Sequence, residues 1–227
     1  MLADSLGASF RRKRGALAFR MIDALIARHG RCRILDVGGT ERYWSLFAPQ
    51  LAEREGKIEI LLSNITGEPP RKSGIFEYMT WDATRPRHLD DIHMVHSNSV
   101  IEHVGGWEGA QKFAANVREQ CENYYVQTPY FWFPVEPHYR ALFFHWLPES
   151  IRYRKIMKRA YATYPKVDDF DQAMTFIREI YLLDKRQMQH IFPDAAIVPE
   201  NVLGLTKSLT AVRFGDAAAT QRLVAGL

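Results

Sequence analysis

"ILDVGGTERYW", residues 34–44, begins as a buried strand and ends in a turn. Apolar residues surround Asp36, and two glycines follow where the strand has to turn. Glycine at such a turn permits a positive φ or the close approach of a ligand. Loops that bind nucleotide-type cofactors usually carry a further glycine two or three residues later, where this chain has Thr40-Glu41-Arg42. The stretch therefore predicts either a modified cofactor loop or a plain strand-to-helix turn.

The residues around this loop alternate between strand and helix patterns. Apolar runs predict five strands, at residues 33–37, 58–63, 75–79, 92–97 and 124–129. Helical spacing of apolar residues predicts helices over 16–29 and 109–121, and a further helix over 43–53 that Pro49 should interrupt. Because such strands pair in parallel through right-handed crossovers, we expect a doubly wound α/β sheet.

The last third of the chain has a different pattern. Two strand-like runs, 195–204 and 206–214, predict an antiparallel pair that closes the sheet. The expected fold is thus a mostly parallel seven-stranded sheet with helices on both faces and an antiparallel last strand. We expect one domain, 1–227, with an inserted helical cap, 130–190, that includes a helix over 170–183. This cap should cover the carboxyl ends of the strands, where ligands bind in such sheets.

The bulk composition is typical of a soluble globular protein. The chain has 227 residues, of which 47% are hydrophobic and 25% are charged. No apolar run approaches the roughly 18 residues of a membrane span, and the N-terminus lacks the apolar core of a signal peptide. The two cysteines, Cys32 and Cys121, fall inside predicted secondary structure. These features predict that the two cysteines are reduced and that the protein is cytoplasmic.

The net charge of +4 is unevenly distributed, because basic residues cluster at 11–14 and at 152–159. One interpretation is two solvated helix faces. The other is weak contact with the phosphate of an anionic lipid, a sugar nucleotide or RNA. Charge alone does not choose between them.

Polar side chains follow the later strands at their expected carboxyl ends. Asn64 ends the second strand, where it suits either a turn or the ribose hydroxyls of a cofactor. In "WDAT", Trp81 offers a flat apolar surface and Asp82 an acceptor, which together suit an adenine ring. The segment "SNSVIEHVGG" (97–106) follows the fourth strand.

The order "ILDVGG", "LLSNIT", "WDAT" and "SNSVIEHV", followed by a strand and "TP", resembles the class I S-adenosylmethionine-dependent methyltransferases. The resemblance covers 33–129 and returns at 203–214. It implies that S-adenosyl-L-methionine is the cofactor, with its methionine end at the glycine loop, its ribose at the second strand, its adenine at the third and its sulfonium above the fourth. The resemblance implies that the cofactor is bound by Asp36, Gly38, Gly39, Asn64, Asp82, Ala83, Ser97, Asn98 and Ser99. To these we add Thr40, for its hydroxyl, and Trp81, for its flat ring.

Two of these positions depart from the family pattern. Thr40 stands where many members have a second loop glycine, and Asn64 stands where most have an acid. Threonine fits only if its φ is negative, and its hydroxyl would then be free to reach the cofactor carboxylate. Because the other motifs fall at suitable distances, we interpret the stretch as a modified cofactor loop.

The segment "TPYFWFPVEPHYRALFFHWLP" (128–148) is dense in aromatic residues and prolines. Its "F-P-x-E-P-H" resembles bacterial methyltransferases of small molecules or envelope glycans. We expect an acceptor pocket here, with substrate-binding residues Tyr130, Trp132, Glu136 and His138. The alternative is that the aromatic side chains only pack the cap onto the sheet.

Methyl transfer from a sulfonium needs mainly alignment and exclusion of water. A base matters when the acceptor arrives protonated, and histidine is the usual choice. Of the candidates His103, His138 and His145, we predict catalytic roles for His103 and His138. No metal site is expected, since His88, His93 and His96 should point in different directions and no cysteine lies near them.

The predicted function is an enzyme that transfers methyl groups to oxygen or nitrogen of a small molecule, sugar nucleotide or glycan. A cofactor-binding or scaffold protein without turnover is an alternative, motivated by Thr40 and Asn64. RNA methylation is a further alternative, which rests on the two basic clusters. It ranks lower because the sequence has no appended RNA-binding module and no proline-rich catalytic tetrapeptide.

Overall fold

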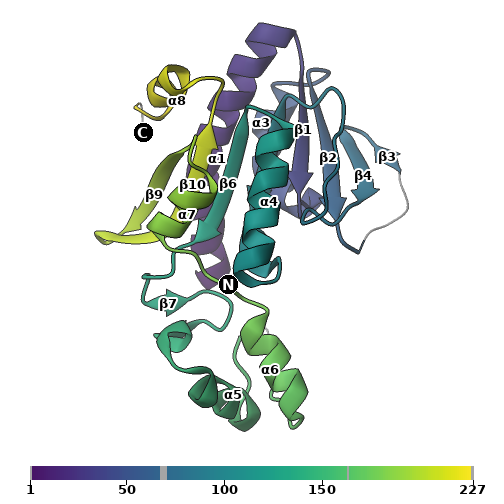
Figure 1. Ribbon diagram of the computed structural model, residues 1–227. Coiled ribbons are helices and arrows are strands. Elements are labelled where there is room, and N and C mark those ends of the chain that lie inside the picture. Colours follow the sequence, from purple (N-terminus) through teal and green to yellow (C-terminus); the bar gives the residue numbers. More distant parts are fainter. Residues whose placement is uncertain (1, 67–70, 163, 226–227) are drawn as a thin grey trace.

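The structure, a computed structural model, describes residues 2–66, 71–162 and 164–225, with side chains from residue 14 onward. Its centre is a sheet in the order β3-β4-β2-β1-β5-β6-β10-β9 (Figure 1). The central five strands pair in parallel, whereas β10 is antiparallel to both of its neighbours and β3 to β4. The strands are β1 (Cys32–Val37), β2 (Ile58–Asn64), β3 (Lys72–Ser73), β4 (Phe76–Thr80), β5 (Met94–Asn98), β6 (Tyr124–Pro129), β9 (Ala196–Val202) and β10 (Leu205–Arg213).

The predicted fold class is confirmed, with one strand more than expected. The seven predicted strands all form, and the predicted antiparallel pair is β9 and β10. The additional strand β3 has two exposed residues and folds back on β4 through Gly74. Because β3 contributes no apolar side chain to a core, it leaves no hydrophobic pattern in the sequence.

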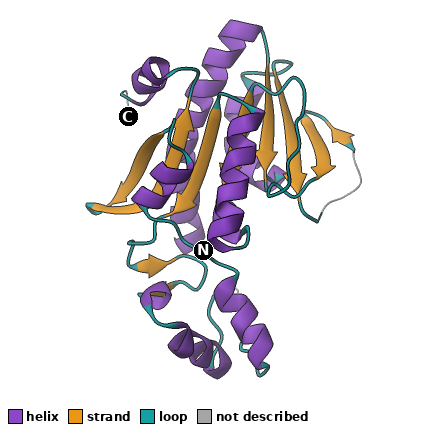
Figure 2. Ribbon diagram, viewed as in Figure 1, coloured by secondary structure: helices purple, strands orange, loops and turns teal. Residues whose placement is uncertain are grey.

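Helices cover both faces of the sheet (Figure 2). On one face lie α1 (Leu2–His29) and α8 (Ala217–Val224), where Ile22 and Leu25 pack with Ile34 of β1. On the other face lie α4 (Gly106–Gln120) and α7 (Lys185–Ile191), and the neighbouring Leu35 packs against them. Adjacent residues of β1 therefore enter opposite cores, as the pleat of a strand requires.

Two predicted helices differ in extent from the observed ones. The helix predicted over 16–29 extends back to Leu2 as α1. The helix predicted over 43–53 is interrupted as expected, into α2 (Glu41–Trp44), the 3-10 turn η1 (Ser45–Phe47) and α3 (Ala48–Ala52), which has Pro49 in its first turn. No helix within the described ranges has both the length and the apolar character of a membrane span.

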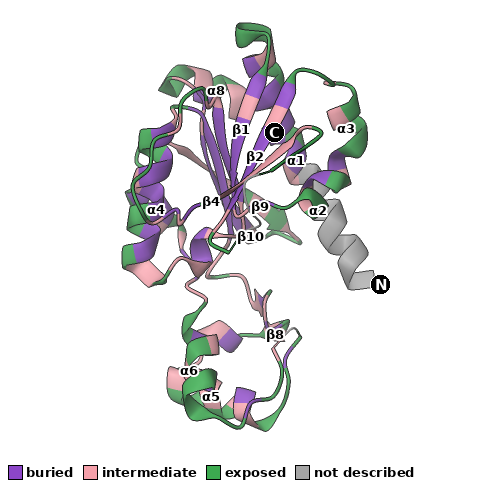
Figure 3. Cartoon of the chain, turned by 90° about the vertical axis from the view of Figure 1, so that its right-hand side faces the viewer, coloured by how far each residue is buried: buried purple, intermediate pink, exposed green. Residues whose placement is uncertain are grey.

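Residues 130–184, here called the lobe, project from the carboxyl edge of the sheet (Figures 1 and 3). The lobe contains β7 (Val135–Glu136), β8 (Ala141–Leu142), η3 (Phe144–Trp146), α5 (Glu149–Lys158) and α6 (Phe170–Arg178). It has a small core of its own, which includes Tyr139, Phe144 and Ile156. The helix α7, which the predicted cap also includes, packs instead on the sheet.

The helix predicted over 170–183 ends earlier, at Arg178. The following chain turns back toward the sheet, where the backbone N–H of Tyr181 donates to the carbonyl of Glu102 at 2.8 Å. Glu102 belongs to η2 (Ile101–His103), which follows β5. This contact connects the lobe to the end of a central strand.

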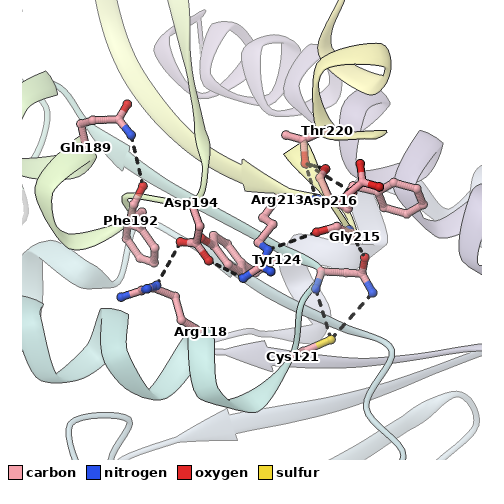
Figure 4. Close-up of polar contacts among 12 residues, drawn as sticks. Arg118, Cys121, Tyr124, Gln189, Phe192, Asp194, Arg213, Gly215, Asp216 and Thr220 are labelled. Atoms are coloured by element: carbon pink, nitrogen blue, oxygen red, sulfur yellow. Dashed lines mark hydrogen bonds and ion pairs between the residues drawn. The ribbon is translucent and has the colours of Figure 1, made fainter. Parts of the chain in front are cut away.

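At the opposite, amino edge of the sheet, Asp194 joins three elements (Figure 4). It accepts hydrogen bonds from Arg118 of α4 at 3.0 Å and from Tyr124 of β6 at 2.7 Å, and it pairs with Arg213 of β10. Burial alone would raise the pKa of Asp194, but the hydrogen bond from Tyr124 and the two arginine charges outweigh it and lower that pKa. We call these four residues the amino-edge network.

Candidate functional site

The glycine loop leaves no room for side chains at Gly38 and Gly39. Gly38 has a φ of +69°, and a Cβ there would lie 2.3 Å from the side chain of Val100. A Cβ on Gly39 would lie 1.9 Å from the carboxylate of Asp36. Both glycines are therefore required by local packing as well as by any ligand.

Thr40 has a φ of −139°, which confirms the condition under which threonine fits this loop. It is the N-cap of α2, and its hydroxyl oxygen accepts from the backbone N–H of Tyr43 at 3.2 Å. The departure from glycine thus starts a short helix by side-chain capping. The loop therefore keeps its tight turn, and the chain leaves it directly into α2.

Asp36 is buried beneath the loop and bonded to two aromatic side chains. Its Oδ2 accepts from Trp44 Nε1 at 2.7 Å, and its Oδ1 lies 2.7 Å from His96 Nδ1. The far nitrogen of His96 lies 3.3 Å from the hydroxyl of Tyr43. Asp36 could either organise the loop or accept a hydrogen bond from a ligand ammonium. The contacts described here serve the first of these roles.

A cavity of about 580 Å³ opens beside the loop at the carboxyl edge, between β1 and β5. The chain crosses from one half of the sheet to the other between these strands, and such switch points bind ligands in doubly wound sheets. Its volume is in the range of small-molecule sites. The lining residues of this loop cavity are Asp36, Gly38, Gly39, Thr40, Arg42, Tyr43, Ser45, Leu46, His96 and Asn98.

Sequence reasoning missed five of the lining residues: Arg42, Tyr43, Ser45, Leu46 and His96. A signal for His96 was present, because it lies two residues before Asn98 and so shares its face of β5. Arg42 and Tyr43 follow the loop on α2, whose orientation depends on the Thr40 cap. That orientation is a property of the folded loop.

Asn64 lies on a second cavity of about 320 Å³, which shares Gly39 and Thr40 with the first. Its Nδ2 donates to the carbonyl of Gly39 at 2.9 Å. A carboxylate in the same place would have no proton to donate. The amide at this position therefore fixes the glycine loop to the end of β2.

The three residues at the end of β5 have different partners. Ser97 is buried and donates to the carbonyl of Val37 at 3.1 Å, and Ser99 donates to Gln127 Oε1 at 3.0 Å. Asn98 lines the loop cavity, and its buried Oδ1 has no hydrogen-bond partner among the described residues. A buried acceptor without a partner costs free energy, so Asn98 is a candidate ligand-binding group.

Trp81, Asp82 and Ala83 are not among the described residues that line either cavity. The indole of Trp81 is buried in the sheet core and donates to the carbonyl of Arg85 at 3.0 Å. Asp82 Oδ1 accepts from the side chain and backbone of Thr84, and these bonds lower the pKa of Asp82. The flat face that the sequence suggested for an adenine ring is therefore covered by core side chains.

The two predicted catalytic histidines meet at the junction of sheet and lobe. His103 Nε2 lies 3.2 Å from His138 Nε2, although the two residues are 35 positions apart. His138 Nδ1 lies 2.6 Å from Glu136 Oε1, and Glu102 Oε1 lies 3.9 Å from His138 Nε2. We call Glu102, His103, Glu136 and His138 the histidine cluster.

Burial and charge act in different directions within this cluster. Burial raises the pKa of Glu102 to about 7. Burial, together with the charge of His138, lowers the pKa of His103. Burial alone would lower the pKa of His138, but the hydrogen bond to Glu136 and its charge outweigh it and raise that pKa. In the absence of other ligands, these directions favour an imidazolium at His138 that donates to Glu136 and to His103.

A third cavity, of about 280 Å³, lies in the lobe and is lined in part by Trp132, Glu136 and His145. Trp132 is 57% exposed, and His145 Nε2 lies 2.6 Å from the carbonyl of Phe131. Arg152 also lines this lobe cavity, and its buried Nε has no hydrogen-bond partner within the described residues. Tyr130 lies at the start of the lobe, where its N–H donates to the carbonyl of Lys207 at 3.0 Å.

No protein-family model matches the sequence, and no curated protein matches it. Solved structures with a similar fold do exist. An O-methyltransferase family protein from Burkholderia thailandensis is 11% identical, with a TM-score of 0.49 over 90% of this chain and 57% of that one. The CMeT domain of a citrinin polyketide synthase is 9% identical, with a TM-score of 0.49 over 82% of this chain and 47% of that one, so the chain spans about half its length.

Another similar structure is the magnesium protoporphyrin IX methyltransferase from Synechocystis PCC 6803 with bound SAH. It is 12% identical, with a TM-score of 0.44 over 87% of this chain and 84% of that one. Similarity at this level does not assign an activity, which has to come from the residues of the site. The order of the strands and the antiparallel β10 give this chain a doubly wound, mostly parallel α/β fold.

Proposed function

We propose that the chain is an enzyme that transfers a methyl group from S-adenosyl-L-methionine to oxygen or nitrogen of a small acceptor. The observation that carries this proposal is the loop cavity, which lies at the switch point of the sheet beside Gly38 and Gly39. A cavity of this kind suits a nucleoside cofactor. The motifs that resemble the methyltransferases select S-adenosyl-L-methionine among such cofactors.

The residues of the loop cavity fit that cofactor in two respects. The loop presents backbone without side chains at Gly38 and Gly39, which allows close approach of a ligand. Asn98 offers a buried acceptor without a partner among the described residues, which suits an ammonium or hydroxyl donor. Gly38, Gly39 and Asn98 are therefore the residues proposed to contact it, while Asp36 and Thr40 hold the loop in shape from within the protein.

S-adenosyl-L-methionine supplies an activated methyl group on a sulfonium, and transfer breaks the sulfur–carbon bond as the acceptor atom forms a new one. The protein has to align the acceptor, exclude water and receive a proton when the acceptor is a hydroxyl or an ammonium. His103 and His138 place two imidazole nitrogens together between the sheet and the lobe. We assign proton transfer to this pair and acceptor binding to the lobe cavity.

The lobe cavity also suggests a class of acceptor. Aromatic walls such as Trp132 favour an apolar or ring-shaped body. Arg152 adds a cationic side chain to the same lining; its Nη1 donates to the carbonyl of Ile177, and its buried Nε has no partner among the described residues. A guanidinium binds carboxylate or phosphate with good geometry. An acceptor with one anionic group, such as a sugar nucleotide or an acidic small molecule, fits these groups.

Calorimetric titration with S-adenosylhomocysteine tests the cofactor assignment. Saturable binding that Asn98→Ala weakens would support the loop cavity. The matched variant Asp82→Ala tests the adenine position that the resemblance implies. Absence of binding at high protein concentration would remove S-adenosyl-L-methionine from the proposal.

A scaffold without turnover is a second candidate, since Asp36 and Asn64 both bond within the protein. It predicts that the chain transfers no methyl group to any acceptor. Incubation with radiolabelled cofactor and fractions of a cell extract separates the candidates, because a labelled product would reject the scaffold.

A further inference from the structure

We propose that Glu102, His103 and His138 form a binding site for one divalent transition-metal ion where the lobe meets the sheet. The site deepens the proposed function, and its role in methyl transfer rests on that function. Metal binding itself does not rest on it. No local sequence pattern marks such a site, because its donors come from two separate segments.

The spacing of the donor atoms suits a single ion. One donor atom from each of the three residues lies within 4.8 Å of the others. Nitrogens bound at about 2.0–2.1 Å to one ion, at angles between perpendicular and tetrahedral, lie about 2.8–3.4 Å apart. The two Nε2 atoms are 3.2 Å apart. Glu102 Oε1 lies 3.9 Å from His138 Nε2, so a small side-chain shift would complete the set.

The carboxylate of Glu102 points to a ligand independently of this spacing. The residue is fully buried, and its Oε2 accepts from Thr128 at 3.0 Å. Its Oε1 has no hydrogen-bond partner anywhere in the described part of the chain. A buried carboxylate oxygen is costly unless a cation or a proton satisfies it. An ion between Oε1 and the two imidazoles would satisfy it.

Outer contacts hold both imidazoles in the orientation that a metal ligand requires. His138 Nδ1 is 2.6 Å from Glu136 Oε1, and Glu136 Oε2 accepts from the N–H of Tyr139 at 2.6 Å. The backbone of Glu179 lies close enough to His103 to raise its pKa, although burial outweighs this effect. Metal-binding histidines usually donate their second ring nitrogen to a carboxylate or a carbonyl in this way. Both Nε2 atoms are consequently turned toward a common point.

The donor set selects the class of metal. Two imidazoles and one carboxylate suit zinc, iron(II), cobalt(II) or manganese(II), whereas calcium and magnesium prefer oxygen donors throughout. Three protein ligands leave positions for water or for an acceptor oxygen. A metal-bound hydroxyl loses its proton more easily. With the ion bound, the Nε2 atoms of His103 and His138 would both be occupied, so neither would act as the base and the proton of the acceptor would pass to water.

The test is calorimetric titration of the whole, chelator-treated chain with Co²⁺ and with Zn²⁺, without cofactor or acceptor. We expect one ion per chain with micromolar or tighter affinity. Glu102→Gln, His103→Ala and His138→Ala should each weaken binding at least about tenfold. His190→Ala is the matched control, since His190 stacks on Trp107 outside the cluster and should leave the affinity unchanged.

The wild-type titration decides the proposal even where a variant does not fold. No binding of either metal, or binding that all three substitutions leave unchanged, would overturn it. The absorption spectrum of the Co²⁺ complex adds a check, because histidine and carboxylate ligands should change it from that of the hydrated ion. Metal binding without S-adenosylhomocysteine binding would keep this site and reject the proposed methyl transfer. The reverse result would reject the metal site alone.

Discussion

The amino-edge network and the carboxyl end of β5 use their polar groups in opposite ways. At the amino edge, Asp194 has both carboxylate oxygens engaged, by Arg118 and Tyr124 on one and by Arg213 on the other (Figure 4). At the carboxyl edge, Asn98 and Glu102 each keep one buried oxygen without a partner within the described ranges. A satisfied network stabilises the fold, whereas an unsatisfied buried group needs a ligand.

The lengths of the connections explain this difference. At the amino edge, α4 leads into β6 within a few residues, so few arrangements of the chain are available and the polar groups bond to one another. At the carboxyl edge, the chain leaves β6 into the lobe and returns only at α7. That excursion forms the lobe and the cavity in it. We therefore expect the proposed reaction to take place at the carboxyl edge, and the polar contacts at the amino edge to stabilise the fold.

The largest expected effect concerns Cys32, which is the first residue of β1 and lies at the amino edge of the sheet. Burial, with a smaller contribution from Cys121, raises the pKa of Cys32 to about 12. At pH 8 its thiolate fraction should be about a thousandfold lower than in the unfolded chain, and labelling slower by a similar factor. Cys121→Ala leaves a single thiol, so reaction with a thiol reagent in buffer and in urea measures the ratio.

The same shift predicts how stability depends on pH. The unfolded thiol ionises near pH 9, whereas the folded one keeps its proton until about pH 12. The unfolded state therefore binds fewer protons in this window, and stability should fall as pH rises through it. Rapid labelling of Cys32 in the folded chain at pH 8 would show that solvent reaches this thiol, and would contradict both predictions.

A second prediction concerns His138 at the carboxyl edge. His138→Ala should reduce turnover about a hundredfold or more and leave the affinity for S-adenosylhomocysteine nearly unchanged. If His138 is a base, the deficit should shrink as pH rises, because a pre-ionised acceptor needs no imidazole. Equal turnover of variant and wild type at pH 7 would remove His138 from the mechanism. A large loss of thermal stability would show instead that it packs the lobe.

The matching substitution at the amino edge should affect stability and leave cofactor binding intact. Asp194→Ala deprives Tyr124 and two arginines of their acceptor, and we expect a loss of about 2 kcal/mol, roughly thirtyfold in the unfolding equilibrium. Urea denaturation measures it. Asp168→Ala is the control, since this exposed carboxylate pairs with the exposed Lys166 and its loss should change the free energy of unfolding by less than about 0.5 kcal/mol. Equal losses in both variants would contradict the structural role of the amino-edge network.

The smallest expected effect concerns the amide of Asn64. Asn64→Asp removes the donor to the Gly39 carbonyl and places a negative charge beside it. We expect S-adenosylhomocysteine to bind about fivefold to tenfold more weakly, which corresponds to about 1 kcal/mol. Asn201→Asp makes the same change on β9, away from the loop cavity, and should have no such effect. Tighter binding by Asn64→Asp would show that the position meets the cofactor ribose.

Much of the fold could be predicted from local patterns. Apolar runs located the seven long strands, because strands buried on both faces need such runs. The strand β3 and the first half of α1 were not predicted, since neither element has a clear apolar period over its whole range. The prediction of a break at Pro49 succeeded because proline removes a backbone donor wherever it occurs.

The site could be predicted only in part. The glycine loop and Asn98 were found because strand ends and glycine pairs are local signals. Trp81 looked like a surface for an adenine ring, but its burial depends on helices far along the chain. His96 was considered only as a metal ligand, and its position between Asp36 and Tyr43 follows from the pairing of β1 with β5.

Local sequence patterns were enough to predict the class of fold, the turn at Gly38 and Gly39 and the negative φ required of Thr40, because each depends on neighbouring residues. The tertiary structure alone decided that Glu102 and His103, which follow β5, meet Glu136 and His138, which follow β6. Such contacts depend on how the lobe packs against the sheet. No local pattern encodes that packing, since it is the sum of many small contacts between distant segments.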